Sequence, residues 1–212
     1  MSRRSQIEFL SRFAGAYDSV VQLLGFESLW QAVADVAAPR AGERSLDVCT
    51  GTGGVALELA RRGAEVFGID LASGMLRHAV RKREDADARN AHFVRMNARH
   101  LAFSDGTFPL VTVSMALHEM AEPERVAVLG EVRRVASERV VVAEYRVPRA
   151  RASAWIFRAK HCFEYLESDD FERFMQHDVK DRLTSVGLIP DGRLDVGSYR
   201  IWACRVDDGA PS

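Results

Sequence analysis

The 212-residue sequence lacks the features that would place it in several specialised classes of protein. Its three cysteines, Cys49, Cys162 and Cys204, are widely spaced, which excludes a disulfide framework and the paired spacing of a zinc site. No apolar run approaches the roughly 20 residues of a membrane-spanning helix, and no apolar signal segment follows the charged N-terminus. We therefore expect a cytoplasmic protein with no metal site and no integral membrane segment.

An excess of charge of either sign is also missing. The chain has 29 Lys and Arg against 30 Asp and Glu, for a net charge of −1. Nucleic-acid-binding domains usually carry a clear basic excess, so we expect no nucleic-acid partner. The hydrophobic fraction of 47% and the charged fraction of 28% are typical of an ordinary globular domain with a full core.

Short apolar runs alternate with amphipathic segments from residue 45 onward. Short apolar runs predict buried strands, and apolar residues three and four apart predict helices. Strands that alternate with helices indicate a parallel, doubly wound α/β sheet. We expect the strands at 45–49, 64–70, 91–97, 109–117 and 138–146, and the helices at 54–63, 73–85 and 122–136.

The alternation stops after residue 146. An aromatic-rich segment at 152–175 and a segment at 177–187 are expected to be helical, and the tail at 188–206 to form two strands around a short turn. The sheet should thus end in an antiparallel strand. Residues 5–38 predict one or two amphipathic helices before the sheet. We predict a single domain made of an N-terminal helical cap (1–40), a cofactor-binding half (41–148), a helical lid (149–176) and a C-terminal helix with a strand hairpin (177–212).

Three glycines fall within four positions just after the first expected strand, in the segment TGTGG at 50–54. A glycine-rich turn between a strand and a helix lets a ligand approach the main chain at the helix N-terminus. The pattern Gly51-x-Gly53-x-x-Ala56 also fits the dinucleotide-binding fingerprint, although a match this short is weak.

Two acids favour a different ligand. Asp47 stands at the end of the first strand, where a carboxylate suits a cationic group better than a pyrophosphate. Asp70 follows the second strand, 19 residues past Gly51, where an acceptor for ribose hydroxyls is expected. A nucleoside with a positively charged tail and no phosphate is S-adenosylmethionine. The alternative for Asp47 is a simple cap at the strand end.

The segments LDVCTGTGG, VFGIDLASGML, RMNARHLAFSDGTFPLVTVSMALHEM and EVRRV follow one another along the chain. They resemble the successive motifs of class I S-adenosylmethionine-dependent methyltransferases, and more narrowly the small-molecule group of the ubiquinone/menaquinone-biosynthesis type (methyltransferase type 11). The N-terminal FAGAYDSVVQLLGF resembles the leading segment of that group. The resemblance covers residues 12–146. It implies a Rossmann-like seven-stranded sheet, mostly parallel with the last strand antiparallel, together with N-terminal helices and a helical cap insertion.

The resemblance also implies roles for individual residues around S-adenosyl-L-methionine. Asp47 would hold the amino-acid end of the cofactor through the loop or a water, and Asp70 would accept from the ribose hydroxyls. Asn97 stands where the family usually has an acid that contacts the adenine amino group, and an amide carbonyl can accept the same hydrogen bond. The cofactor-binding residues expected in this way are Tyr17, Asp47, Gly51, Thr52, Gly53, Asp70, Leu71, Met75, Asn97, Ala98 and Met115.

His118 is the candidate catalytic residue, because it follows the fourth strand at the carboxyl edge of the sheet. An unperturbed imidazole, with a pKa of about 6.5, suits the removal of a proton from a phenol or an acidic carbon. A purely structural role is the alternative for His118. Glu119 is read as a helix cap, and the pair Glu144 and Tyr145, at the end of the fifth strand, is read as structural with a site role held open.

The expected function is methyl transfer to a small-molecule acceptor by in-line displacement. The fourth strand ends in Ser-Met-Ala-Leu-His, which lacks the Asn/Asp-Pro-Pro-aromatic signature that resembles nucleobase and glutamine-amide methyltransferases. A quinol precursor, phenol, amine or lipid headgroup remains as the acceptor. The helices before residue 39 and the aromatic segment 152–175, with Trp30 among their aromatic residues, are expected to cover its pocket. The alternatives are a nicotinamide-dependent oxidoreductase and a non-catalytic S-adenosylmethionine-binding partner subunit; the oligomeric state is open.

Overall fold

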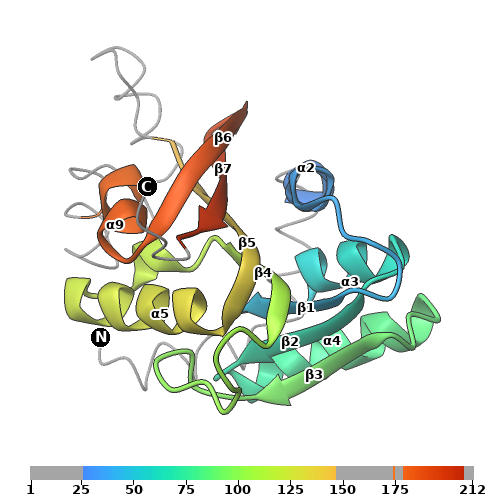
Figure 1. The fold of residues 1–212 in the computed structure, drawn as a ribbon. Coiled ribbons are helices and arrows are strands. Elements are labelled where there is room, and N and C mark those ends of the chain that lie inside the picture. Colours follow the sequence, from blue (N-terminus) through green and yellow to red (C-terminus); the bar gives the residue numbers. More distant parts are fainter. Residues whose placement is uncertain (1–25, 147–173, 175–178, 208–212) are drawn as a thin grey trace, which may run out of the picture.

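A seven-stranded sheet organises the part of the chain that the computed structural model describes, which is residues 26–146, 174 and 179–207 (Figure 1). The strands are β1 (Arg44–Val48), β2 (Glu65–Asp70), β3 (Ala91–Arg95), β4 (Phe108–Ser114), β5 (Ala136–Tyr145), β6 (Leu188–Val196) and β7 (Tyr199–Val206). The helices are α2 (Phe26–Ala37), α3 (Gly54–Arg61), α4 (Ser73–Asp85), α5 (Glu122–Val135) and α9 (Val179–Ser185), with a 3₁₀ turn η1 (Leu117–Glu119). Among the described residues, no helix is long and apolar enough to cross a membrane.

The strand order is β3-β2-β1-β4-β5-β7-β6, and the neighbouring strands from β3 to β5 are parallel. The chain enters at β1, winds outward to β3, and then crosses back to place β4 on the other side of β1. This reversal between β1 and β4 is the point at which open α/β sheets form a crevice at the carboxyl ends of their strands. The predicted doubly wound sheet is confirmed.

The antiparallel strand is β7, which pairs with β5 on one side and β6 on the other. The prediction that the last strand runs against the others is therefore confirmed. This strand lies between β5 and β6 and not at the edge of the sheet, because the DVGS turn folds β7 back into the gap beside β5. The ladder between β6 and β7 shifts register between Pro190 and Gly192.

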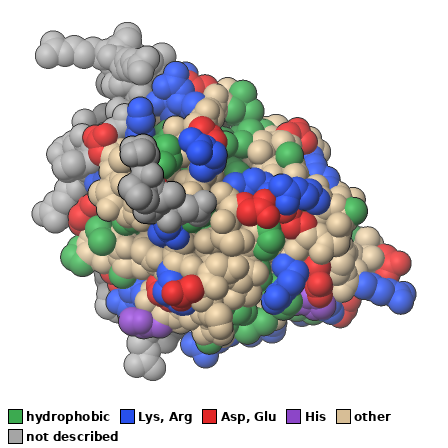
Figure 2. All heavy atoms as spheres, viewed as in Figure 1, with side chains coloured by type: hydrophobic (Ala, Val, Ile, Leu, Met, Phe, Trp, Pro, Cys, Tyr) green, Lys and Arg blue, Asp and Glu red, His purple; other side chains and the backbone are tan. Residues whose placement is uncertain are grey.

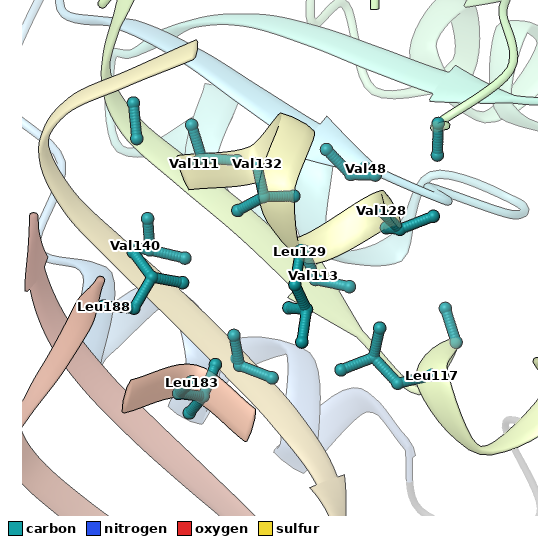
Figure 3. Close-up of a cluster of buried hydrophobic side chains, with 14 of the residues drawn as sticks. Val48, Val111, Val113, Leu117, Val128, Leu129, Val132, Val140, Leu183 and Leu188 are labelled. Atoms are coloured by element: carbon teal, nitrogen blue, oxygen red, sulfur yellow. The ribbon is translucent and has the colours of Figure 1, made fainter. Parts of the chain in front are cut away.

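One face of the sheet is covered by α5 and α9 (Figure 1). Figure 3 shows the side chains of this layer pointing toward one another from β1, β4, β5, β6 and the two helices. Alternate strand residues face it, as the two-residue period of a strand requires. The labelled members of this cluster are Val48, Val111, Val113, Leu117, Val128, Leu129, Val132, Val140, Leu183 and Leu188.

The other face carries α2 and α3, with α4 beside them over β2 and β3 (Figure 1). Leu29 and Val33 of α2 pack with Leu59 of α3 in a second buried cluster. Helix α3 ends in a Schellman motif, in which the N–H groups of Gly63 and Ala64 bond the carbonyls of Ala60 and Leu59. Gly63 has a φ of 93°, which explains the glycine at the predicted end of this helix.

The predicted boundaries hold within a few residues, with one instructive difference. Helix α5 passes into β5 with no connecting loop, since α5 ends at Val135 and β5 begins at Ala136. We expected the strand to begin at 138 after a short turn. The first expected helix lies outside the described residues. The expected lid (149–176) and the aromatic segment 152–175 within it also lie outside them, except for Phe174. The division into cap, cofactor-binding half and lid thus stays a prediction.

The outer surface is mixed in charge. On the face drawn in Figure 2, basic and acidic side chains lie interspersed. Ion pairs of the described residues include Arg139 with Glu43 and Arg134 with Glu131. Such a face carries no field of one sign that would steer a polyanion to it.

Candidate active site at the carboxyl edge of the sheet

The loop between β1 and α3 is a tight left-handed turn. Cys49, Gly51 and Gly53 all have positive φ angles, of 58°, 55° and 80°. The amide of Thr50 donates to the carbonyl of Ile69, and the amide of Gly53 donates back to the carbonyl of Thr50. The turn thereby points the first amides of α3 toward the carboxyl edge, where a helix N-terminus attracts negative or electron-rich groups.

The two predicted glycines serve different physical needs. A Cβ on Gly51 would meet no heavy atom of the described residues within 4 Å, so within this part of the chain the backbone there borders open space. A Cβ on Gly53 would lie 2.8 Å from Cζ of Phe93 and 3.1 Å from Cβ of Ala79. Gly53 therefore lets the loop pack on its neighbours, whereas Gly51 leaves room for a ligand against the main chain.

Asp47 lies beneath this loop. Its carboxylate accepts from the hydroxyls of Thr50 (2.6 Å) and Thr112 (2.7 Å), and only 2% of the residue is exposed. Burial raises the pKa of Asp47 to about 6, against these hydrogen bonds and that of the Ala56 amide, and the charge of Asp70 raises it further. In the described structure the side chain shapes the loop from below, and its expected action on a cofactor through that loop stays a prediction.

Asp70 joins the ends of the first two strands. Its Oδ2 accepts from the amide of Gly51 at 2.9 Å, and its Oδ1 accepts from the amide of Ala72 at 2.8 Å. Burial raises the pKa of this carboxyl group. The amide of Leu71 is a third donor to this carboxylate, which leaves one of its four lone pairs to accept from a diol hydroxyl. The structure thus brings together Gly51 and Asp70, which are 19 residues apart in the sequence.

The residues predicted around an adenine lie near the ends of β2 and β3. Met75 is buried in the first turn of α4, and Leu71 is half-buried at the end of β2. Asn97 accepts from the amide of Arg99 through Oδ1, so its carbonyl already closes a local turn. Ala98 is buried in the cluster beneath α5.

Two further predicted cofactor residues differ from the rest in their placement. The hydroxyl of Thr52 accepts from Nζ of Lys82 at 3.2 Å, so this side chain points toward α4. Tyr17 lies outside the described residues. Trp30, expected over the acceptor, instead packs on the N-terminus of α3, where a Cβ on Gly54 would meet its ring at 2.2 Å. This contact explains the third glycine of the loop.

Backbone strain marks the switch point. The non-glycine residues with positive φ among the described residues are Ala38, Cys49, Asp87 and Met115. Cys49 and Met115 follow the paired strands β1 and β4, so left-handed residues flank the crevice on both sides. A non-glycine residue in this conformation costs about 1–3 kcal/mol and often marks a functional site. The amide of Met115 donates to the carbonyl of Ala143 at 2.8 Å, which holds the strained turn against β5.

His118 lies in η1, directly after this strained turn. It is 5% exposed, and its Nδ1 lies 2.9 Å from Oε2 of Glu144, which is fully buried at the end of β5. The rings of Tyr145 and Phe174 approach the imidazole edge-on, with centroid distances of 4.8 and 6.3 Å. An imidazole held this way by a carboxylate can take a proton from a bound molecule.

A cluster of two arginines supports η1 from α5 and α9. Arg125, 1% exposed, donates from Nε to the carbonyl of Leu117 at 2.7 Å and from Nη1 to Glu122 at 2.8 Å. Arg182 also bonds Glu122, through two nitrogens at 2.8 Å. Both guanidinium groups lie over the ring of Phe174, at 4.9 and 5.6 Å from its centroid.

Sequence reasoning missed Arg125 and underrated Glu144. A signal for Arg125 exists, because it lies three residues before Val128 and seven before Val132, on the buried stripe of α5. A charged residue on such a stripe needs a partner, and here that partner is the carbonyl before His118. Glu144 gave no such signal, because its partners lie 26 to 28 residues away in the sequence.

Comparison with known proteins agrees with this geometry. A family model described as a methyltransferase domain matches residues 46–139. A demethylmenaquinone methyltransferase from Thermus thermophilus is 39% identical over 155 residues, which cover 70% of this chain and 69% of that protein. The enzyme of the same name from Beutenbergia cavernae is 37% identical over 147 residues, which cover 64% of this chain and 58% of that protein.

Solved structures share the fold at low sequence identity. An S-adenosyl-L-methionine-dependent methyltransferase structure from Methanococcus maripaludis aligns with a TM-score of 0.69 at 13% identity, covering 95% of each chain. The magnesium protoporphyrin IX methyltransferase from Synechocystis, solved with bound SAH, aligns with a TM-score of 0.61 at 20% identity, covering 97% of this chain and 88% of that one. Sequence and fold together give one conclusion. The chain belongs to the class I S-adenosylmethionine-dependent methyltransferases of the menaquinone-biosynthesis type, whose methyl donor is S-adenosylmethionine.

Proposed function

We propose that this protein methylates a reduced, demethylated naphthoquinone, an acceptor of the kind named for its demethylmenaquinone methyltransferase relatives. The observation that carries the proposal is the buried pair of His118 and Glu144 beside the strained end of β4. A reduced quinone carries phenolic hydroxyls, and removing one of their protons makes the neighbouring ring carbon nucleophilic. The pair supplies a base for that proton.

The residues of the β1–α3 loop and the end of β2 fit the methyl donor. Gly51 borders open space, Asp70 has acceptor capacity for a diol, and both lie at the helix N-terminus that opens the crevice. In the proposal these two residues hold the nucleoside, with Leu71, Met75 and Asn97 around the base and Met115 nearest the reacting methyl group. When bound, S-adenosylmethionine supplies an electrophilic methyl group.

His118 is the proposed catalytic residue. Its Nε2 accepts the proton of the acceptor hydroxyl, so that the O–H bond breaks as the N–H bond forms. The ring carbon would then gain the methyl group as the bond from that methyl group to the donor sulfur breaks, leaving S-adenosylhomocysteine. The hydrogen of that carbon would leave as a proton to solvent, which restores the aromatic ring, and His118 would return its proton to the acceptor oxygen. A buried imidazole between aromatic rings suits this task, because a flat acceptor can stack where water is excluded.

The test compares oxidation states of one acceptor. A demethylmenaquinone analogue with a short side chain is incubated with S-adenosylmethionine under reducing and oxidising conditions, and the products are measured by mass spectrometry. We expect methylation of the reduced form alone. The His118→Asn variant should bind S-adenosylhomocysteine like the parent and lose about 100-fold in turnover, the lower end of general-base contributions. Equal methylation of both oxidation states would overturn the proposal.

The comparisons favour neither alternative function, and the short dinucleotide-type pattern at Gly51, Gly53 and Ala56 is the only sequence feature that fits one of them. A nicotinamide-dependent oxidoreductase would require tight binding of NAD(H). A non-catalytic subunit would require binding of S-adenosylmethionine without turnover on any acceptor. The same assay, together with a binding titration, therefore separates the two alternatives. A cytoplasmic location and the absence of a nucleic-acid partner stay predictions that belong to this proposal.

A further inference from the structure

Glu144 is the meeting point of three elements. Its Oε1 accepts from the amides of Ala116 (2.9 Å) and Leu117 (2.6 Å), and its Oε2 lies 2.9 Å from Nδ1 of His118. The amide of Tyr145 also reaches Oε2, at 3.4 Å. With an exposure of 0%, this carboxylate meets protein donors from the end of β4, from η1 and from its own strand. So many donors on one buried acid exceed what capping a 3₁₀ turn requires.

We infer that Glu144 is a positioning residue that keeps the hydrogen of His118 on Nδ1 and presents Nε2 as the proton acceptor. This inference rests on the proposed function, because it concerns the base of that reaction. A carboxylate oxygen only accepts hydrogen bonds, so the contact with Oε2 places the ring hydrogen on Nδ1. The lone pair then lies on Nε2, the nitrogen away from β5.

The same carboxylate also acts after the proton has moved. Once Nε2 is protonated, the imidazole carries a positive charge, and Glu144 lies against it with no water between them. Glu119 is the second acid near the ring, with Oε1 at 4.0 Å from Nε2, but its side chain is 57% exposed and its effect is screened. Of these two acids, buried Glu144 thus stabilises the charged ring more.

The two arginines that the structure describes near η1 do not bond the imidazole ring. Arg125 of α5 bonds the carbonyl of Leu117 and not the imidazole, and Arg182 of α9 bonds Glu122. The groups in ring contact from β5 and from Phe174 are uncharged aromatic rings. Among the described residues, the charged groups that reach the ring are therefore the two acids, Glu144 and Glu119.

Glu144→Gln separates this role from that of a turn cap. Glutamine has the same length, and its amide oxygen can accept from the amides of Ala116 and Leu117 as Oε1 does. Its NH₂ group then faces Nδ1 as a donor, which forces the ring hydrogen onto Nε2 and removes the acceptor. A residue that only capped the turn would tolerate this change.

The first readout is the tautomer of His118 and needs no acceptor. In protein labelled with ¹⁵N at histidine, the signals of His118 are identified by their loss in His118→Asn, and long-range ¹H–¹⁵N spectra show which nitrogen carries the hydrogen. We expect hydrogen on Nδ1 in the parent and on Nε2 in Glu144→Gln. Hydrogen on Nε2 in the parent itself would overturn the inference, whether or not the variant folds.

The second readout is turnover. Glu144→Gln should lower kcat by about 100-fold, within the range of general acid–base effects, with little change in KM for S-adenosylmethionine. The loss of activity of the parent at low pH, where Nε2 is protonated, should disappear from the residual activity of the variant. In the His118→Asn background Glu144→Gln should cause no further loss. Parental kcat in a folded Glu144→Gln variant would contradict a positioning role.

The two readouts keep this inference distinct from the proposed function. If the parent shows the Nδ1 tautomer and Glu144→Gln reverses it, the positioning role stands even where no quinol is methylated. If the quinol is methylated by the parent and by Glu144→Gln alike, the proposed function stands and the positioning role falls.

Discussion

The proposed cofactor end and the proposed acceptor end of the site are built in different ways. The cofactor end consists of the β1–α3 loop and the end of β2, and its key contacts involve main-chain amides, as in the bond from Gly51 to Asp70. The acceptor end depends on buried side chains that converge from separate elements, as in the contact of His118 with Glu144. The conformation of a loop that depends on its backbone can be predicted from a short stretch of sequence. Side chains that converge from separate elements can be identified only in the folded structure.

The largest effect is expected from breaking the cofactor end. Gly51→Val should place a branched side chain in the open space beside the loop and weaken S-adenosylhomocysteine binding by roughly 100-fold or more, about 3 kcal/mol. Isothermal titration calorimetry measures this change.

Gly42→Val is the matched control for Gly51→Val. Gly42 has a φ of 73° and an equally open position, but it lies before β1, at the opposite edge of the sheet. It reports the backbone strain alone and should leave affinity unchanged. Similar affinity in the parent and in a folded Gly51→Val variant would remove this glycine from the site.

A second change should break the acceptor end and spare the cofactor end. Arg125→Met removes a fully buried guanidinium from the carbonyl of Leu117, and we expect a loss of about 3 kcal/mol in the free energy of unfolding. Turnover should fall because His118 loses its support, while cofactor affinity stays near the parental value. Urea denaturation and calorimetry measure the two effects.

Arg134→Met is the control for this variant. Arg134 also bonds two carboxylates and two carbonyls, but at the surface, so a loss of no more than about 1 kcal/mol is expected. Equal destabilisation by both variants would mean that burial of Arg125 carries no special weight.

The third change concerns the loss of folding stability that comes from burying the carboxylate of Asp47. The pKa of Asp47 is about 6 in the folded protein against 3.8 for the free group, so the folded state binds this proton more tightly. The free energy of unfolding should thus fall as the pH rises from about 4 to about 6, by roughly 2–3 kcal/mol from this residue.

Asp47→Asn removes this pH dependence. Relative to the parent, the variant should gain stability across that window, and denaturation curves at several pH values give the difference. Parallel curves for the two proteins would show that burial of Asp47 carries no such cost. The acids with lowered pKa values, such as Glu43 and Glu131, act in the opposite direction but cancel in the comparison.

The smallest effect tests how far side chains contribute at the cofactor end. Asp70→Asn keeps one acceptor oxygen and should weaken S-adenosylhomocysteine binding by about tenfold, the value of one hydrogen bond to a charged group. Asp70→Ala also releases the amides of Gly51 and Ala72 and should weaken it further. An affinity for S-adenosylhomocysteine that is unchanged in both variants would show that Asp70 does not bind the ribose hydroxyls.

The conformation of the β1–α3 loop could be predicted from the sequence because local rules suffice there. Glycine at positive φ, a strand followed by a helix, and an acid after the second strand are all legible without tertiary contacts. Predicting that Asp47 turns beneath the loop would have required knowing that Thr112, on another strand, lies beside it. The same holds for Glu144, which looked like an ordinary strand-end acid until β4 and β5 were paired.

The order in which the strands of the sheet can pair affects how the protein folds during its synthesis. Ser45 pairs with Val66 of β2, but its second partner, Leu110 of β4, is made later. Arg182, which lies over Phe174, is made later still. During synthesis at about 5–20 residues per second, the loop around Gly51 and Asp70 can form first, and Arg182, which is 112 residues after Asp70 (182 − 70), is added roughly 6–22 s later. We therefore expect the nascent chain to be ready to hold a nucleoside before it is able to act on an acceptor.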